Sequence, residues 1–164
     1  MKSLFAAFLS ALLLCACTDH LEEDIMPNSP DASFLNASFS YVSSTNQYGV
    51  SAASWAGKSQ ITFYYISDSE EGDPQGRIIW NYGESKTALK AWWRLDKSDG
   101  KMAIFGESGT AGFLSLLNYH PTIKENWRAV HINENGNLII EPSKDENIRW
   151  ELERVNDVLP WSGE

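Results

Sequence analysis

The sequence predicts an all-β fold, either a single small antiparallel up-and-down barrel or a barrel-like sandwich of about eight strands. Three observations support this prediction. Short segments with a period of two recur along the chain, turn residues separate them, and no long span after residue 16 carries a strong helical stripe. Because hairpin signals join consecutive segments, an up-and-down strand order is favoured.

The clearest strands lie in the C-terminal third of the chain. Three are expected there, over residues 127–132, 137–141 and 148–155. Asn135 and Gly136 lie between the first two, and Asn-Gly is the strongest short-range hairpin signal because both residues tolerate a positive φ. In the last segment Ile148, Trp150 and Leu152 share one side, so we expect this side to face the core.

Earlier segments show the same alternation. The expected strands cover residues 34–42, 60–66, 77–82, 89–95 and 102–104. The turn Asp96–Gly100 should join the last two as a hairpin. Phe113–Leu117 is apolar without a clear period, which is typical of either a strand or one turn of helix. Residues 34–164 have the common size for one domain with one core.

The N-terminus has the layout of a secretory signal. Lys2 supplies a positive charge, and residues 4–14 are apolar apart from one serine, a stretch too short to span a bilayer comfortably. The segment ends in Leu14-Cys15-Ala16-Cys17, which resembles the lipobox of bacterial lipoproteins. This resemblance implies a signal peptide over residues 1–16 and acylation of Cys17. The alternative is an ordinary secretory peptide with two incidental cysteines.

Residues 17–33 are expected to form a disordered tether. After Cys17 this segment has five acidic residues, two prolines and no Lys or Arg, a composition that cannot bury a core. The acidic run resembles the signals that send lipoproteins of Bacteroidetes-type bacteria to the outer face of the outer membrane, and a plain solvated spacer is the alternative. We therefore expect a lipid-anchored protein of the outer membrane, facing the periplasm or the cell surface.

The charge of the domain argues against several partners. Residues 34–164 contain 12 Lys and Arg against 17 Asp and Glu, with no basic cluster in sequence. Nucleic acid and anionic head groups are therefore not expected as partners.

Part of the chain resembles a known family. A succession of short segments carries the resemblance. The segments are Ile61-Thr62-Phe63, Arg77–Trp80, Trp93–Asp96 with Asp99–Ile104, Trp127, Asn137–Ile140 and Trp150–Glu153. This succession resembles the small lipocalin-like domains of Bacteroidetes lipoproteins. The resemblance covers roughly residues 61–154. It implies a lipocalin-like barrel and a cell-envelope location, and it implies no particular activity.

No residue pattern indicates catalysis, a metal site or a cofactor. Gly106-Glu107-Ser108-Gly109 lacks the last glycine of a nucleophile elbow and its strand-turn-helix context. The acidic loop 68–74 misses the calcium-loop spacing and is expected to be a solvated hairpin tip. His120 and His131 have no ligand partner at strand spacing, and His131 is expected to be half-buried on its strand. The sequence therefore predicts a protein that is not an enzyme.

The tryptophans are the most unusual feature. Seven occur in the chain, and Trp80, Trp93 and Trp150 lie on the apolar sides of their predicted strands. Trp92 lies on the opposite side with Lys90 and Arg94, so it either contacts a ligand or partner or packs beneath a loop or the N-terminal strand. The other candidate contact residues are Tyr48, Tyr82 and Trp161.

Two functions follow as expectations. The leading one is a non-enzymatic lipoprotein whose barrel binds a small or apolar ligand at its mouth. The alternative is a cell-surface module that binds a glycan, inhibits an enzyme or binds another protein through exposed aromatic side chains.

Overall fold

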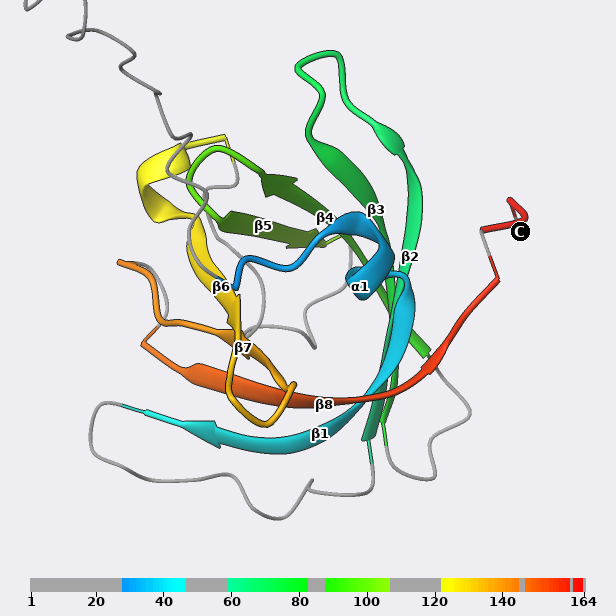
Figure 1. The fold of residues 1–164 in the computed structure, drawn as a ribbon, viewed down its shortest axis with the longest axis vertical. Helices are drawn as coiled ribbons and strands as arrows, with labels where there is room; N and C mark the ends of the chain where they lie inside the picture. Colours follow the sequence, from blue (N-terminus) through cyan, green and yellow to red (C-terminus); the bar gives the residue numbers. More distant parts are fainter. Residues whose placement is uncertain are drawn as a thin grey trace, which may run out of the picture.

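The chain folds as a closed barrel of eight antiparallel strands in up-and-down order, as the sequence predicts (Figure 1). The computed structural model describes residues 28–46, 59–82, 88–106, 122–144, 147–159 and 161–163. The strands are β1 (Ala37–Thr45), β2 (Ser59–Asp68), β3 (Pro74–Tyr82), β4 (Ala88–Asp96), β5 (Lys101–Gly106), β6 (Arg128–Ile132), β7 (Leu138–Ile140) and β8 (Arg149–Asp157). Two short helices, α1 (Ala32–Leu35) and the 3-10 helix η3 (Lys124–Asn126), complete the described fold.

The barrel closes where β1 pairs with β8. Their register runs from Ala37 opposite Asp157 to Thr45 opposite Arg149, with two irregularities along the way. Every other strand pairs with its neighbour in sequence. A closed sheet leaves no edge strand, which removes the usual site of unwanted strand pairing.

Alternation along the strands fills the inside of the barrel. The side chains of Trp80, Trp93, Trp150 and Leu152 point inward and are 0–2% exposed, as their sequence positions predict. Ile148 is partly buried against this core. The apolar side expected for the last strand is therefore confirmed.

A glycine lets β2 and β3 approach closely. Trp93 on β4 donates a hydrogen bond from Nε1 to the carbonyl oxygen of Tyr64 over a distance of 3.2 Å. Gly76 on β3 pairs with Trp93, and a Cβ at Gly76 would overlap that same oxygen and lie 2.9 Å from Nε1. Only a residue without a side chain leaves room for this contact.

The hairpin between β6 and β7 is one residue longer than the Asn-Gly signal suggests. The Asn133 N–H donates to the carbonyl oxygen of Asn137, and the Asn133 side chain accepts the N–H groups of Asn135 and Asn137. Gly136 alone takes a positive φ, of 80°. The hairpin is confirmed, but its turn depends on the Asn133 side chain.

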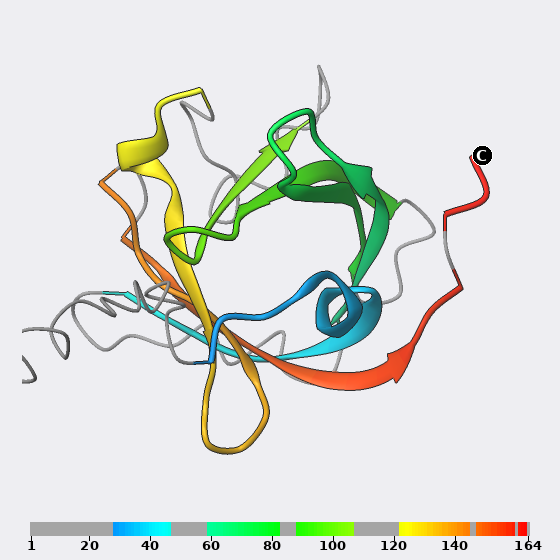
Figure 2. The ribbon, with the colours of Figure 1, turned by 45° about the horizontal axis from the view of Figure 1, so that its top comes forward.

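The N-terminal part of the domain differs from the expectation. Residues 34–35, expected in the first strand, belong to α1, because the Asp31 carboxylate accepts the Phe34 N–H at 2.7 Å and caps the helix. α1 lies across one opening of the barrel and buries Leu35 there (Figure 2). Residues 28–33, expected in the tether, also contact the barrel, since the Ile132 N–H donates to the Asn28 carbonyl oxygen.

One cation faces inward. Arg128 on β6 pairs with the inward-facing Met102 and is completely buried. Its guanidinium donates to the carbonyl oxygens of Glu141, at 2.8 Å from Nε, and of Ile148. These bonds offset the cost of burying the charge and tie β6 to the segment before β8.

Candidate functional site

The described inward-facing side chains of the barrel pack against one another. One run of aromatic rings joins Phe34, Phe39, Phe63 and Trp93, and a second joins Tyr41, Trp150 and Trp80, with centroids 5.3–6.3 Å apart. α1 lies across the opening nearest the first run (Figure 2). The loops 47–58, 83–87 and 107–121 lie outside the described residues, as does the expected Phe113–Leu117 element.

The outer face of the barrel carries a row of large side chains. Tyr64 on β2, Arg77 on β3, Trp92 on β4 and Phe105 on β5 are successive cross-strand partners, and we call them the outer aromatic row. All four are partly exposed. They face outward because their strand neighbours face the core. Four strands thus bring together residues far apart in sequence.

Arg77 lies between two tryptophans. Its Cζ atom is 4.3 Å from the ring centroid of Trp92 and 5.5 Å from that of Trp161, distances typical of cation–π contacts. The Trp161 ring also meets Tyr64 edge-on, at 5.1 Å between centroids and an angle of 68°. The C-terminal segment therefore adds a fourth aromatic ring to the three of the row.

Asn36 directs the C-terminal segment toward this row. The side-chain Nδ2 of Asn36 donates to the Val158 carbonyl oxygen at 2.8 Å, and the main-chain carbonyl oxygen of Asn36 accepts the Val158 N–H at 3.3 Å. The Asn36 side-chain oxygen accepts the N–H of Tyr65 at 3.0 Å. One side chain thus joins the start of β1, the middle of β2 and the residue after β8.

The structure brings together two of the four predicted contact residues. Trp92 and Trp161 both contact Arg77, and Trp92 is half-buried. Tyr48 lies outside the described residues. Tyr82 ends β3 opposite Ser59, and its side chain is not among those described.

Sequence reasoning missed Arg77 and Tyr64 as site residues. Tyr64 follows the core residue Phe63 and therefore faces the opposite side of the strand, which is a usable signal, but the pairing of that side with Arg77 and Trp92 depends on the register between strands. The two hairpins that set this register are short, so a register search across them could have found the row.

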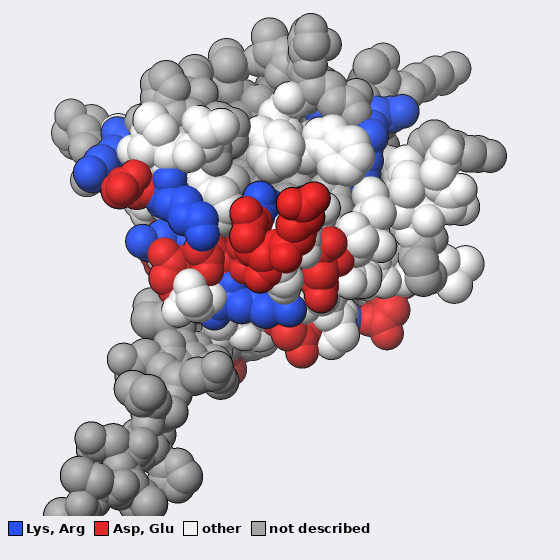
Figure 3. All heavy atoms as spheres, turned by 90° about the horizontal axis from the view of Figure 1, so that it is seen from above, with Lys and Arg blue, Asp and Glu red and all other residues white. Residues whose placement is uncertain are grey.

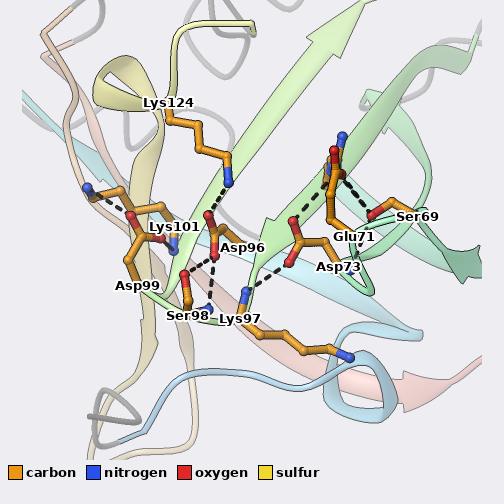
Figure 4. Close-up of polar contacts among 10 residues, drawn as sticks. Ser69, Glu71, Asp73, Asp96, Lys97, Ser98, Asp99, Lys101 and Lys124 are labelled. Atoms are coloured by element: carbon orange, nitrogen blue, oxygen red, sulfur yellow. Dashed lines mark hydrogen bonds and ion pairs between the residues drawn. The ribbon is translucent and has the colours of Figure 1, made fainter. Parts of the chain in front are cut away.

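A second surface, at the α1 end of the barrel, is charged. Figure 3 shows acidic side chains gathered there with basic side chains around them. Asp73 is buried, not solvated as expected for the loop after β2, because it lies 3.6 Å from Arg94 Nη2 and accepts the Lys97 N–H at 3.4 Å. Arg94 also pairs with Glu71 (Figure 4). This network holds the β2–β3 and β4–β5 loops together.

Asp96 is the most perturbed carboxylate of this charged surface. Burial would raise the pKa of Asp96, but hydrogen bonds from Lys124 Nζ, at 2.6 Å, and from the Ser98 hydroxyl and N–H outweigh it and lower the pKa to about 2 (Figure 4). The same contact raises the pKa of Lys124. Asp96 is therefore a stable anion that fixes η3 against the β4–β5 hairpin.

The described residues contain no group of three or more His, Cys, Asp or Glu side chains that could hold a metal ion. His131 is half-buried, as predicted, with Nε2 3.8 Å from Glu141. His120 and Cys17 lie outside the described part of the chain. Within that part, no helix is long and apolar enough to cross a membrane.

The outer aromatic row and Trp161 thus form the best-defined candidate site among the described residues: an Arg side chain between two tryptophans on the outside of the barrel. Comparison with known proteins adds no relative to this description, since no family model, curated protein or solved structure matches the chain.

Proposed function

We propose that this protein is a non-enzymatic, lipid-anchored protein of the outer membrane that binds another protein through the outer aromatic row. One observation carries the proposal, the Trp92–Arg77–Trp161 stack on the outer face. Trp, Tyr and Arg are the residues that most often dominate the energy of protein interfaces. The barrel serves as a rigid support for them.

The packing of the described inward-facing side chains favours the outer face, rather than the barrel interior, as the binding surface. A small apolar ligand needs a cavity lined by inward-facing side chains. The inward side chains of Phe39, Phe63 and Trp93 are completely buried and contact one another. The outer row, in contrast, is partly exposed over four adjacent strands.

The stack favours a protein over a glycan. Sugars bind to open faces of aromatic rings, but the Arg77 guanidinium already covers one face of Trp92 at 4.3 Å. A partly desolvated guanidinium is well suited to a carboxylate of a protein partner. Lys90, exposed on the same strand as Trp92, adds a second positive charge near the row. We therefore expect the contacting surface of the partner to be acidic.

Photo-crosslinking in the native cell tests this proposal. A photoreactive amino acid replaces Lys90 beside the row in one variant and Glu153 on the outside of β8 in a matched control. We expect a discrete adduct from position 90 that is sensitive to protease, that position 153 does not give, and that Trp92→Ala abolishes without lowering the amount of folded protein. An adduct that survives Trp92→Ala, or equal labelling at both positions, would contradict the proposal. A product sensitive to glycosidases would instead identify a glycan.

The membrane anchor is tested separately. Cys17→Ser should abolish incorporation of a labelled fatty acid and move the protein from the membrane fraction to the soluble fraction. Label that persists in the variant would refute acylation at Cys17. Loss of the anchor leaves the barrel intact, so the soluble variant also serves for measurements in solution.

A further inference from the structure

Beyond Val158, the described part of the C-terminal segment contacts the barrel through the Trp161 side chain. After the Val158 contacts with Asn36, Leu159 is 84% exposed, and Ser162 and Gly163 are exposed as well. Among the described residues of this segment, Trp161 alone has recorded ring contacts with the barrel, with Tyr64 and Arg77. We call the surface formed by Tyr64 and Arg77 the Trp161 site.

We propose that the Trp161 site is an exchangeable peptide site, occupied by the protein's own C-terminal segment until an aromatic side chain of a partner peptide replaces Trp161. The inference rests on the proposed function, because it specifies how a protein partner engages the outer row. One edge-on ring pair and one partly exposed cation–π contact favour the occupied form by about 5- to 50-fold. This preference is strong enough to keep the site filled and weak enough for a partner to overcome.

The chemistry of the site defines the partner peptide. The site offers a ring edge from Tyr64 and a cation from Arg77, so it suits an aromatic residue with a carboxylate close by. Ile66, two residues beyond Tyr64 on β2, is an exposed apolar side chain. It offers contact area for an apolar neighbour of the aromatic residue.

Exchange has a thermodynamic consequence for affinity. A partner that must displace Trp161 binds with an affinity reduced by the fraction of molecules in which the site is open. Removing the Trp161 ring opens the site in every molecule. The apparent affinity for a competing peptide should then rise by the same 5- to 50-fold.

A peptide added in trans tests the exchange without the natural partner. The probe is a fluorescein-labelled peptide with the sequence of residues 158–164, and the protein is the full mature chain carrying Cys17→Ser. Fluorescence anisotropy should show the peptide binding about 5- to 50-fold more tightly to the Trp161→Ala chain than to the unsubstituted chain. Ser162→Ala, an exposed change in the same segment, should leave the affinity unchanged.

One further protein variant and one peptide variant serve as controls. Adding Arg77→Gln to Trp161→Ala should remove the gain in peptide affinity. A peptide with Ala in place of Trp should not bind either chain. Equal affinity of the unsubstituted and Trp161→Ala chains, in proteins with the same urea midpoint, would overturn the exchange. The crosslinking at position 90 is independent of this result. An adduct at position 90 without peptide exchange would support the protein interface and refute only the exchangeable site. Peptide exchange without an adduct would refute the proposed protein partner.

Discussion

Replacing Gly76 with Ala should be among the most damaging single-methyl changes in this barrel. The added Cβ would overlap the Tyr64 carbonyl oxygen and lie 2.8 Å from its carbon and 2.9 Å from Trp93 Nε1. These neighbours are backbone and a buried ring, so neither can rotate away. β2 and β3 must separate, which breaks the hydrogen bond from Trp93.

The magnitude follows from two contributions. Overpacking a filled core by one methyl group costs about 1–3 kcal/mol. Leaving the buried Trp93 N–H without its acceptor costs about 1–3 kcal/mol more. We therefore expect Gly76→Ala to lower the free energy of unfolding by about 2–6 kcal/mol.

Urea unfolding of the soluble Cys17→Ser chain measures this loss, followed by tryptophan fluorescence. Gly72→Ala is the matched control, because a Cβ there meets no atom within 4 Å and the cost comes only from its φ of +84°, about 1–2 kcal/mol. In a Trp93→Phe background Gly76→Ala should still cost about 1–3 kcal/mol, since the clash with the Tyr64 backbone remains. A loss for Gly76→Ala no larger than that for Gly72→Ala would refute the close approach of β2 and β3.

Three other measurements address the core, the charged surface and the two sides of β4. Trp150→Ala should destabilise the domain by about 3–5 kcal/mol, because the ring is buried and meets two other rings edge-on; a loss below about 1 kcal/mol in urea would invert the face assigned to β8. The pKa of Asp96 falls from 3.8 to about 2 on folding. The ionised Asp96 side chain therefore contributes its full stabilisation of the folded state above the ordinary pKa, and this stabilisation disappears as the pH drops toward 2. Asp96→Asn should therefore lose on the order of 2 kcal/mol at pH 5 and almost nothing at pH 2, and an equal loss at both values would contradict this assignment. An aqueous quencher separates the tryptophan fluorescence into an accessible and an inaccessible fraction. Trp92→Phe should lower the accessible fraction and Trp93→Phe should not. A lower accessible fraction in Trp93→Phe would show that the two faces of β4 are exchanged.

The fold was predictable because its determinants are local. Period-two alternation and turn residues act over a few positions, and they place Trp93 and Trp150 inside the barrel. The sequence does not predict α1, although its capping residue is visible, because Asp31 also fits the acidic composition of a tether. A four-residue helix has too short a stripe to detect by periodicity, so only the capping residue marks it.

The candidate site was only half predictable. The position of Trp92 on the polar side of its strand marked it as unusual, and Trp161 was a candidate by residue type alone. Their meeting at Arg77 depends on the register of three strands and on the hydrogen bonds that direct the C-terminal segment. The inward burial of Arg128 has no sequence signal, since the carbonyl groups of Glu141 and Ile148 that accept from it are main-chain groups supplied by other parts of the chain.

The pairing of β1 with β8 has a consequence for the order of folding events. Ala37 pairs with Asp157, 120 positions later, so the barrel cannot close until both ends of this span are available. Contacts between such distant residues make folding slow, on the millisecond-to-second scale typical of β-barrels. During synthesis from the N-terminus onward, β1 therefore has no β8 to pair with until the end of this span has been made. Closure of the sheet is a late event, and a chain cut short before β8 keeps two unpaired strand edges.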